Sequence, residues 1–157
     1  MNSVNPYEYG LPREAANFQA LSPLSFIERA ASVYPQRLAL INGRFRQTWG
    51  ETYARSIRLA SALAKRGIGV GDTVAVIAPN GPAMFEAHFG VPMCGAVLNA
   101  INTRLDAETI AFILQHGEAK VLLVDKEFGE TVRRATSHLP KRPQIIAIDD
   151  PSTTRDC

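Results

Sequence analysis

The chain has 157 residues, a length that favours a single domain with a sizeable buried core. Hydrophobic residues make up 46% and charged residues 20%, as in ordinary globular proteins. The net charge of +2 is small and the lysines and arginines are scattered, which argues against nucleic acid or an anionic membrane surface as a partner.

The two cysteines, Cys94 and Cys157, form neither a CxxC pair nor a Cys/His cluster. We therefore expect no zinc site and no disulfide scaffold, and a reducing cytoplasm is the expected location. The first residues lack the basic start and apolar core of a secretion signal, which favours the same location. The most apolar stretch, residues 84–101, is interrupted by polar residues and a proline, so no membrane span is expected.

The N-terminal third of the chain predicts an arm and a first helix. Residues 1–20 show no periodicity and are expected to form an irregular arm. A helix is predicted to begin at Ser22-Pro23, because serine caps helices and proline fits their first position, and to end at Pro35. Its buried face is expected to comprise Leu24, Ile27, Ala31 and Tyr34.

A β-hairpin is predicted next. Residues 37–41 have the composition of a strand, and residues 44–47 would return antiparallel to it. We expect the turn at Asn42-Gly43, because both residues accept a positive φ.

A second helix is predicted to follow the hairpin directly. Thr48 is the expected N-cap, and Glu51 three residues later completes a capping box. Gly67 suits the left-handed position after the helix, with Lys65-Arg66 at its negative end. The residues expected on its buried side are Tyr53, Ile57, Ala60, Leu63 and Ala64.

From residue 73 onward, predicted strands and helices alternate. The strands are expected at 73–78, 96–100, 120–124 and 144–148. The helices are expected at 83–94, from the cap Asp106 to Gly117 with Ile110, Ile113 and Leu114 inward, and at 127–138. This alternation predicts parallel pairing with right-handed crossovers. The expected fold class is therefore α/β, a layered and mostly parallel sheet with flanking helices and an early antiparallel hairpin.

Two familiar nucleotide-binding motifs are not supported. The glycines at 67, 69 and 71 follow a helix and precede a strand, which is the reverse of the dinucleotide-binding arrangement. No G-x-x-x-x-G-K-[ST] phosphate loop occurs, and no G-x-S-x-G motif supplies a nucleophile. None of the three histidines, His88, His116 and His138, has a partner at metal-ligand spacing.

The polar segment 99–105 lies past a predicted buried strand, at a carboxyl end where α/β proteins place their sites. Asn102 and Asp106 can hold the turn through local hydrogen bonds, and Arg104 could reach an anion. Turn and packing chemistry is the favoured interpretation, and a wall of a substrate cleft is the alternative. Asp125 and the pair Asp149-Asp150 also follow strands, and we expect them to be solvated turn residues.

Three segments carry a family resemblance: Thr-Trp-Gly-Glu-Thr-Tyr at 48–53, Gly-Asp-Thr-Val-Ala-Val-Ile-Ala-Pro-Asn at 71–80, and 95–105, which ends in Asn-Thr-Arg-Leu. In this order and spacing they resemble the start of the AMP-forming acyl-CoA synthetases, members of the adenylate-forming superfamily. The segment 110–125 also fits, and the likeness runs from residue 21 to residue 150. It implies that residues 21–150 are the N-terminal part of an AMP-binding, adenylate-forming domain.

Enzymes of this family activate a carboxylic or fatty acid with ATP and magnesium, form an acyl-adenylate and pass the acyl group to coenzyme A. The glycine-rich phosphate loop and the catalytic lysine lie further along in the family, and nothing in this chain matches them. The resemblance therefore assigns no catalytic, cofactor-binding or metal-ligating residue here. ATP, Mg and coenzyme A are expected for the full-length family, and no cofactor is expected for this chain alone.

Residues 151–157 depart from the family, in which an acidic and aromatic stretch follows. A one-base deletion that converts a Pro-Glu-Tyr-Asp-Ala-Gly reading into Pro-Ser-Thr-Thr-Arg-Asp would explain them. The downstream DNA tests this frameshift hypothesis, which is wrong if no other frame encodes a Ser/Thr/Gly-rich loop.

Three functions follow as hypotheses. The first is an N-terminal segment of an acyl-CoA ligase that is inactive alone, and the second is a non-catalytic interaction or small-molecule-binding module. The third is a self-contained nucleotide-binding domain, which the absent phosphate loop disfavours and which alone predicts tight binding of magnesium ATP. A sheet that stops partway leaves an open edge, so self-association is also expected.

Overall fold

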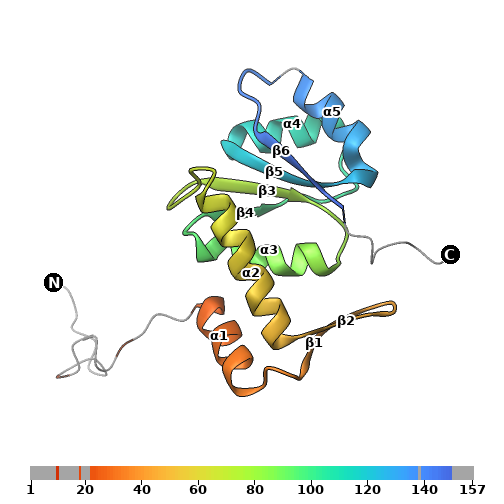
Figure 1. Ribbon diagram of the computed structural model, residues 1–157. Coiled ribbons are helices and arrows are strands. Elements are labelled where there is room, and N and C mark those ends of the chain that lie inside the picture. Colours follow the sequence, from red (N-terminus) through yellow and green to blue (C-terminus); the bar gives the residue numbers. More distant parts are fainter. Residues whose placement is uncertain (1–9, 11–17, 19–21, 138, 150–157) are drawn as a thin grey trace.

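The fold is an α/β sandwich with a hairpin and a helix attached at one end (Figure 1). The computed structural model describes residues 10, 18, 22–137 and 139–149. The predicted arm and the C-terminal tail lie almost wholly outside these residues, so their predictions stay untested.

Helix α1 (Pro23–Val33) begins as predicted. The side chain of its N-cap Ser22 accepts a hydrogen bond from the Leu24 N–H at 3.2 Å. Ile27 is fully buried, but the prediction that Tyr34 belongs to the same face is wrong, since its side chain is 52% exposed. The helix ends at Val33, so Tyr34 leaves the helical face and its ring instead stacks under the Arg37 guanidinium, 5.0 Å away.

Strands β1 (Leu38–Asn42) and β2 (Phe45–Thr48) form the predicted antiparallel hairpin. The predicted turn is wrong by one residue, because Asn42 pairs with Phe45 and the two-residue loop is Gly43-Arg44. Gly43 has a positive φ of 55°. Two-residue loops need a positive φ at their first residue, because only then does the turn match the right-handed twist of the flanking strands.

Helix α2 (Trp49–Ala64) starts with the predicted capping box. Thr48 Oγ1 accepts from the Glu51 N–H at 3.3 Å, and the Thr48 N–H donates to Glu51 Oε2 at 2.8 Å. Gly67 closes the region in the left-handed conformation, with a φ of 78°. These terminal signals were therefore read correctly from the sequence.

The prediction of the buried face of α2 is confirmed at Leu63 and wrong at Ile57. The buried residues are Thr52, Ser56 and Leu63, whereas Ile57 is 45% exposed. The two hydroxyl groups donate to carbonyls one turn earlier in the same helix, each at 2.8 Å, so they are satisfied when buried. Their small size lets the backbone of α2 approach the neighbouring helix α3 closely.

The central sheet contains four parallel strands in the order β4-β3-β5-β6. Their bounds are Val97–Ala100 for β4, Thr73–Ile77 for β3, Ala119–Asp125 for β5 and Gln144–Ile148 for β6. The crossover helices are α3 (Pro82–Met93), α4 (Ala107–His116) and α5 (Gly129–Ser137). The predicted parallel α/β class is confirmed, and only the last helix differs, since a 3-10 turn over Lys126–Phe128 precedes it.

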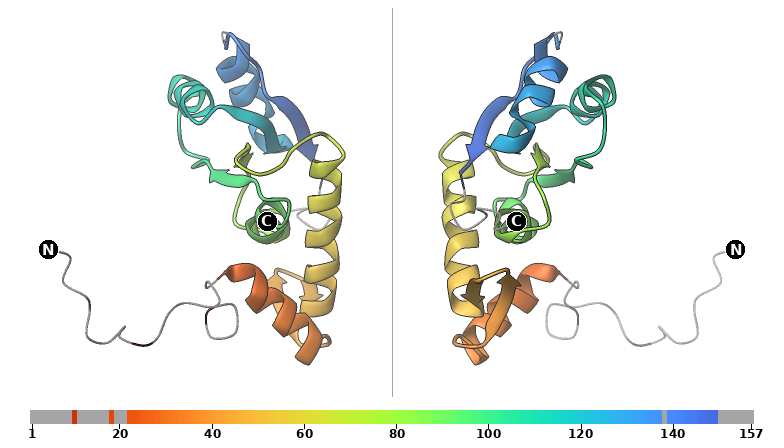
Figure 2. Two further views of the ribbon diagram at one scale, coloured as in Figure 1. Left: turned by 90° about the vertical axis from the view of Figure 1, so that its left-hand side faces the viewer. Right: turned by 90° about the vertical axis from the view of Figure 1, so that its right-hand side faces the viewer.

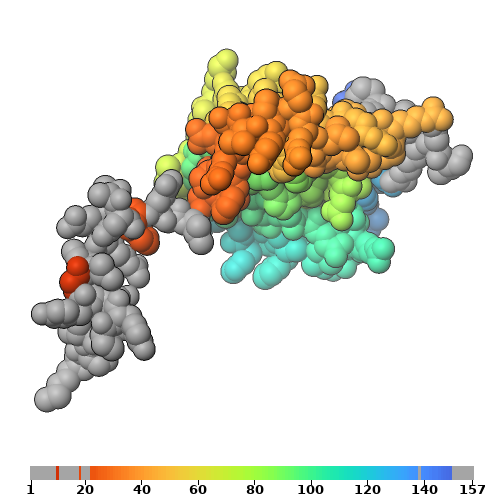
Figure 3. All heavy atoms as spheres, turned by 90° about the horizontal axis from the view of Figure 1, so that it is seen from below, coloured from red at the N-terminus to blue at the C-terminus, as the bar shows by residue number. Residues whose placement is uncertain are grey.

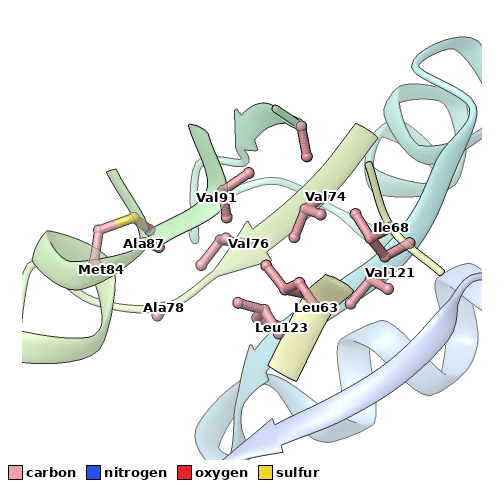
Figure 4. Close-up of a cluster of buried hydrophobic side chains, with 11 residues drawn as sticks. Leu63, Ile68, Val74, Val76, Ala78, Met84, Ala87, Val91, Val121 and Leu123 are labelled. Carbon is pink, nitrogen blue, oxygen red and sulfur yellow. The ribbon is translucent and has the colours of Figure 1, made fainter. Parts of the chain in front are cut away.

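Successive strand residues point to opposite faces of the sheet, and both faces are covered. Alternate residues of β3 and β5 pack on one side against α2 and α3, around Leu63, Met84 and Val91 (Figure 4). The residues between them pack on the other side against α4 and α5, around Ile110, Leu114 and Val132. The views in Figure 2 show the resulting three layers edge-on.

The hairpin and α1 lie at the end of the molecule away from this sandwich (Figures 1 and 3). They join it through α2 and α3, which α1 also contacts. The N-terminus of α2 is held by the backbone as well, since the Trp49 N–H donates to the Arg37 carbonyl at 2.9 Å.

Candidate functional site

All four parallel strands end at the same edge of the sheet, and the chain reverses direction within it. From β3 it crosses to β4 on one side, and from β4 it returns past β3 to β5 and then β6. The crossovers through α3 and α5 lie on opposite faces of the sheet. The topological switch point, at which neighbouring strands lead to helices on opposite faces, therefore lies between the carboxyl ends of β3 and β5. Ligands of doubly wound proteins bind at this position, which makes it the candidate site.

The loop after β4 is built by local hydrogen bonds. The Ile101 N–H donates to the Val76 carbonyl at 2.9 Å, which extends the β3–β4 ladder into the loop. Asn102 Oδ1 accepts from the Arg104 N–H at 2.9 Å, and Asp106 Oδ1 accepts from the Thr109 N–H at 2.8 Å. These bonds agree with the predicted turn roles of Asn102 and Asp106.

Arg104 is the group in this loop that remains available. Its backbone is fixed by the Asn102 side chain, while its exposed guanidinium has no hydrogen-bonding or ionic partner among the described residues. A cation held on an ordered turn at the carboxyl edge of the sheet is suited to an anionic ligand.

The carboxylates at the same edge have structural partners. Asp125 Oδ1 accepts from the Glu127 N–H at 3.0 Å and so caps the 3-10 turn. Asp149 forms an ion pair with Lys126 at 2.6 Å, in which both side chains are more than 60% exposed. Such a pair contributes little stability. The predicted turn roles of Asp125 and Asp149 fit these contacts, and Asp150 lies outside the described residues.

The carboxylates whose pKa values are shifted have structural roles and are not suited to acid catalysis. Hydrogen bonds from Thr48 lower the pKa of Glu51, and the Lys120 ammonium, 2.5 Å from Asp72, lowers the pKa of that residue. The Thr109 N–H does the same for Asp106. Each shift favours the charged form, whereas a general acid at neutral pH needs the opposite shift.

A buried polar cluster joins the hairpin to α2 and α3, and the sequence interpretation missed it. Gln47 Nε2 donates to Thr52 Oγ1 at 2.8 Å and to Glu86 Oε1 at 3.1 Å. Glu86 also forms an ion pair with Arg55. Gln47, Thr52 and Glu86 are all buried, and Gln47 Oε1 has no hydrogen-bond partner among the residues that the structure describes. The sequence offered one signal for this cluster, which is that Glu86 is the one carboxylate in the mostly apolar stretch 82–94.

The histidines occupy separate places. His88 Nδ1 lies 2.8 Å from the Met84 carbonyl, and the His116 ring stacks on Phe112 with centroids 5.5 Å apart. His138 lies outside the described residues. Across the part of the chain that the structure describes, no group of three or more His, Cys, Asp or Glu side chains could hold a metal ion.

The geometry thus defines a class, a doubly wound α/β unit in which the carboxyl ends of the parallel strands lie at one edge of the sheet. Comparison with known proteins identifies the family. Residues 27–156 match the family described as "AMP-binding enzyme", to which the chain belongs. The predicted resemblance is confirmed.

Individual relatives agree with this family. The chain is 54% identical over 148 residues to the peroxisomal acetate/butyrate–CoA ligase of Arabidopsis thaliana, covering 89% of this chain and 26% of that protein. It is 50% identical over 149 residues to an acetate–CoA ligase of Humulus lupulus, with 90% and 26% covered. The structure of a Mycobacterium tuberculosis fatty acyl CoA synthetase superimposes with a TM-score of 0.74 at 28% identity, over 82% of this chain and 26% of that one. The chain therefore spans about a quarter of the length of these relatives.

Proposed function

We propose that this chain forms the N-terminal part of an acid–thiol ligase that activates a carboxylic acid with ATP and transfers it to coenzyme A. The observation that carries the proposal is the identity of 54% to an acyl-CoA ligase over 89% of the chain. Because the chain spans 26% of that relative and contains no phosphate loop, it is inactive on its own.

In that reaction the chain supports the fold of the enzyme and contributes one wall of the site that binds the ligands. ATP, magnesium and coenzyme A supply the adenylation and thioester chemistry when the remaining part of the enzyme holds them. The residues after β4 form one wall of the ligand cleft, and Arg104 offers a charged hydrogen-bond donor to a phosphate group of ATP or coenzyme A.

The proposed acid is a short aliphatic or aromatic one. Relatives with 54%, 47% and 50% identity are described as ligases of acetate or butyrate, of butyrate and of benzoate. Fatty acids of longer chain are a broader alternative, because the family also includes the fatty acyl CoA synthetase of similar fold.

A pyrophosphate-release assay tests this function. The 157-residue chain is expected to release none from ATP with acetate, butyrate or benzoate, whereas a longer gene product with the missing segment is expected to release it. Release of pyrophosphate by the 157-residue chain alone would overturn the proposal that the chain is inactive without the remaining part of the enzyme.

Arg104→Ala in that longer product tests the cleft wall. Loss of a charge-assisted hydrogen bond is expected to raise the KM for ATP or coenzyme A by roughly tenfold or more. The matched control is Arg29→Ala, which removes an exposed arginine of α1 away from the sheet edge. Equal KM values for both variants and the wild type would exclude a binding role for Arg104.

We propose a cytoplasmic location, because the few cysteines of the chain form no disulfide pattern. Relatives from Arabidopsis thaliana and Petunia hybrida that are described as peroxisomal make the peroxisome the competing outcome. No helix of the described residues is long and apolar enough to cross a membrane. A fluorescent fusion of the longer product distinguishes the two compartments.

A further inference from the structure

A concave site whose described lining includes none of residues 99–105 lies between the hairpin and the first turns of α3. It is a pocket of ≈ 300 Å³, which is the lower end of the range for small-molecule sites. The described residues that line the pocket come from β1, from the loop after β3 and from α3.

The walls divide into an apolar part and a polar part. Leu40 on β1 and Met84 and Phe85 on α3 provide the apolar part. The polar part consists of Asn42 at the end of β1, Asn80 after β3 and His88 on α3. Few polar groups among apolar walls are typical of sites that orient one small molecule.

The chemistry of the polar groups limits the occupant. No Lys, Arg, Asp or Glu side chain is among the described residues that line the pocket, which argues against a polyphosphate or a metal ion. Side-chain amides of Asn42 and Asn80 can donate to a carbonyl oxygen. His88 has one ring nitrogen engaged with the Met84 carbonyl, which can only accept, so that nitrogen carries the hydrogen and Nε2 is left for a ligand.

Gly81 is the N-cap of α3 and lies beside the Asn42 side chain at the end of β1. A Cβ placed on Gly81 would lie 3.6 Å from Asn42 Nδ2, which is ordinary van der Waals contact. The absent side chain therefore leaves space beside an amide donor, and an alanine at this position would fill it without displacing the backbone.

We propose that this pocket binds a small acyl compound, an apolar body with a single carbonyl head, as in a monocarboxylate or its amide. The body packs between Leu40, Met84 and Phe85, and the carbonyl oxygen accepts from the Asn42 and Asn80 amides. The site is separate from the cleft wall at Arg104, and it does not depend on the ligase function, since binding requires neither ATP nor coenzyme A.

The test is a titration of the ¹⁵N-labelled 157-residue chain with benzoate, benzamide and benzylamine, followed by amide chemical shifts. Benzoate and benzamide are expected to cause saturable shifts confined to residues 40–42 and 80–88, with a dissociation constant on the order of 1 mM. Benzylamine has the same ring without a carbonyl and is expected to cause no saturable shift. Equal binding of benzylamine, or shifts spread evenly over the chain, would overturn the proposal.

Two alanine variants complete the test. Gly81→Ala is expected to weaken benzoate binding at least fivefold, because the new methyl group occupies the space beside Asn42. Gly129→Ala is the matched control, since a Cβ there meets no atom within 4 Å and the residue lies at the start of α5. Unchanged binding by a folded Gly81→Ala chain would also overturn the proposal, whatever the pyrophosphate assay shows.

Discussion

At the scale of single residues, side chains that bond to their own backbone organise this molecule. Ser22, Thr48 and Asp106 each cap a helix, and all three were identified from the sequence. Their partners are only two or three residues away, so spacing alone reveals them.

Asp106 provides a pH-dependent prediction. The Thr109 N–H stabilises the charged carboxylate, so the pKa of folded Asp106 lies below its ordinary value of 3.8. Its contribution to stability is complete above that value and is lost as the pH falls through the folded pKa. Asp106→Asn keeps an equally good cap that does not titrate, so it should match the wild type at neutral pH and lose less stability between about pH 5 and pH 2.

Urea unfolding midpoints at several pH values measure this difference. Asp106→Ala serves as the comparison, because it lacks the cap at every pH and should be less stable throughout. A wild-type chain and an Asp106→Asn chain with parallel acid profiles would show that the Thr109 bond contributes nothing to acid sensitivity.

Contacts between distant residues were not accessible from the sequence. Glu86 and Gln47 are 39 positions apart and meet because the hairpin folds over α3. A contact between residues one helical turn apart, such as Thr48 and Glu51, can be predicted from sequence spacing without knowledge of the tertiary structure. The same limit applies to the pocket, whose polar groups come from β1, from the loop after β3 and from α3.

At the scale of elements, the strands and helices follow from their patterns, but the inward face of α2 follows only in part. The sequence favoured its apolar side, and the structure buries Thr52 and Ser56 because α2 crosses α3 at a glycine. Helical periodicity gives the apolar stripe, whereas close backbone contact selects small side chains regardless of polarity.

Gly90 in α3 is the residue that permits this crossing. A Cβ on Gly90 would lie 2.9 Å from the Ser56 carbonyl oxygen and 2.8 Å from Leu59 Cδ2, and the carbonyl belongs to the backbone of α2. Gly90→Ala should therefore destabilise the chain by about 1–3 kcal/mol, although alanine in an unhindered helix is favoured by about 1 kcal/mol.

Urea unfolding of Gly90→Ala measures this effect, with Gly129→Ala as the control for the intrinsic preference of alanine. The control should be as stable as the wild type or slightly more so. A Gly90→Ala chain as stable as the control would contradict close packing of α2 on α3.

At the scale of the whole molecule, the sheet ends in β6, which pairs only with β5 among the described strands. Ile145 on this edge is 47% exposed. An open edge that carries an apolar side chain favours pairing with another chain. We therefore expect the isolated chain to be marginally stable and to self-associate.

Sedimentation at several concentrations tests this expectation with Ile145→Lys, because lysine on an edge strand opposes pairing. The variant should stay monomeric at concentrations at which the wild type associates. Val70→Lys is the control, since Val70 is 91% exposed in a loop away from this edge. A clean wild-type monomer with a sharp, reversible unfolding transition would contradict the expectation.

The hairpin is attached to the sandwich by side chains and a few backbone bonds rather than by a shared ladder, since among the described strands β1 and β2 pair only with each other. A two-stranded ribbon has little stability of its own. It follows that the ribbon can detach while β3 and β5 stay intact, in a subglobal opening. Its amide protons would then exchange with solvent deuterons well before those of the central strands, and the small-molecule pocket would vanish with each such opening.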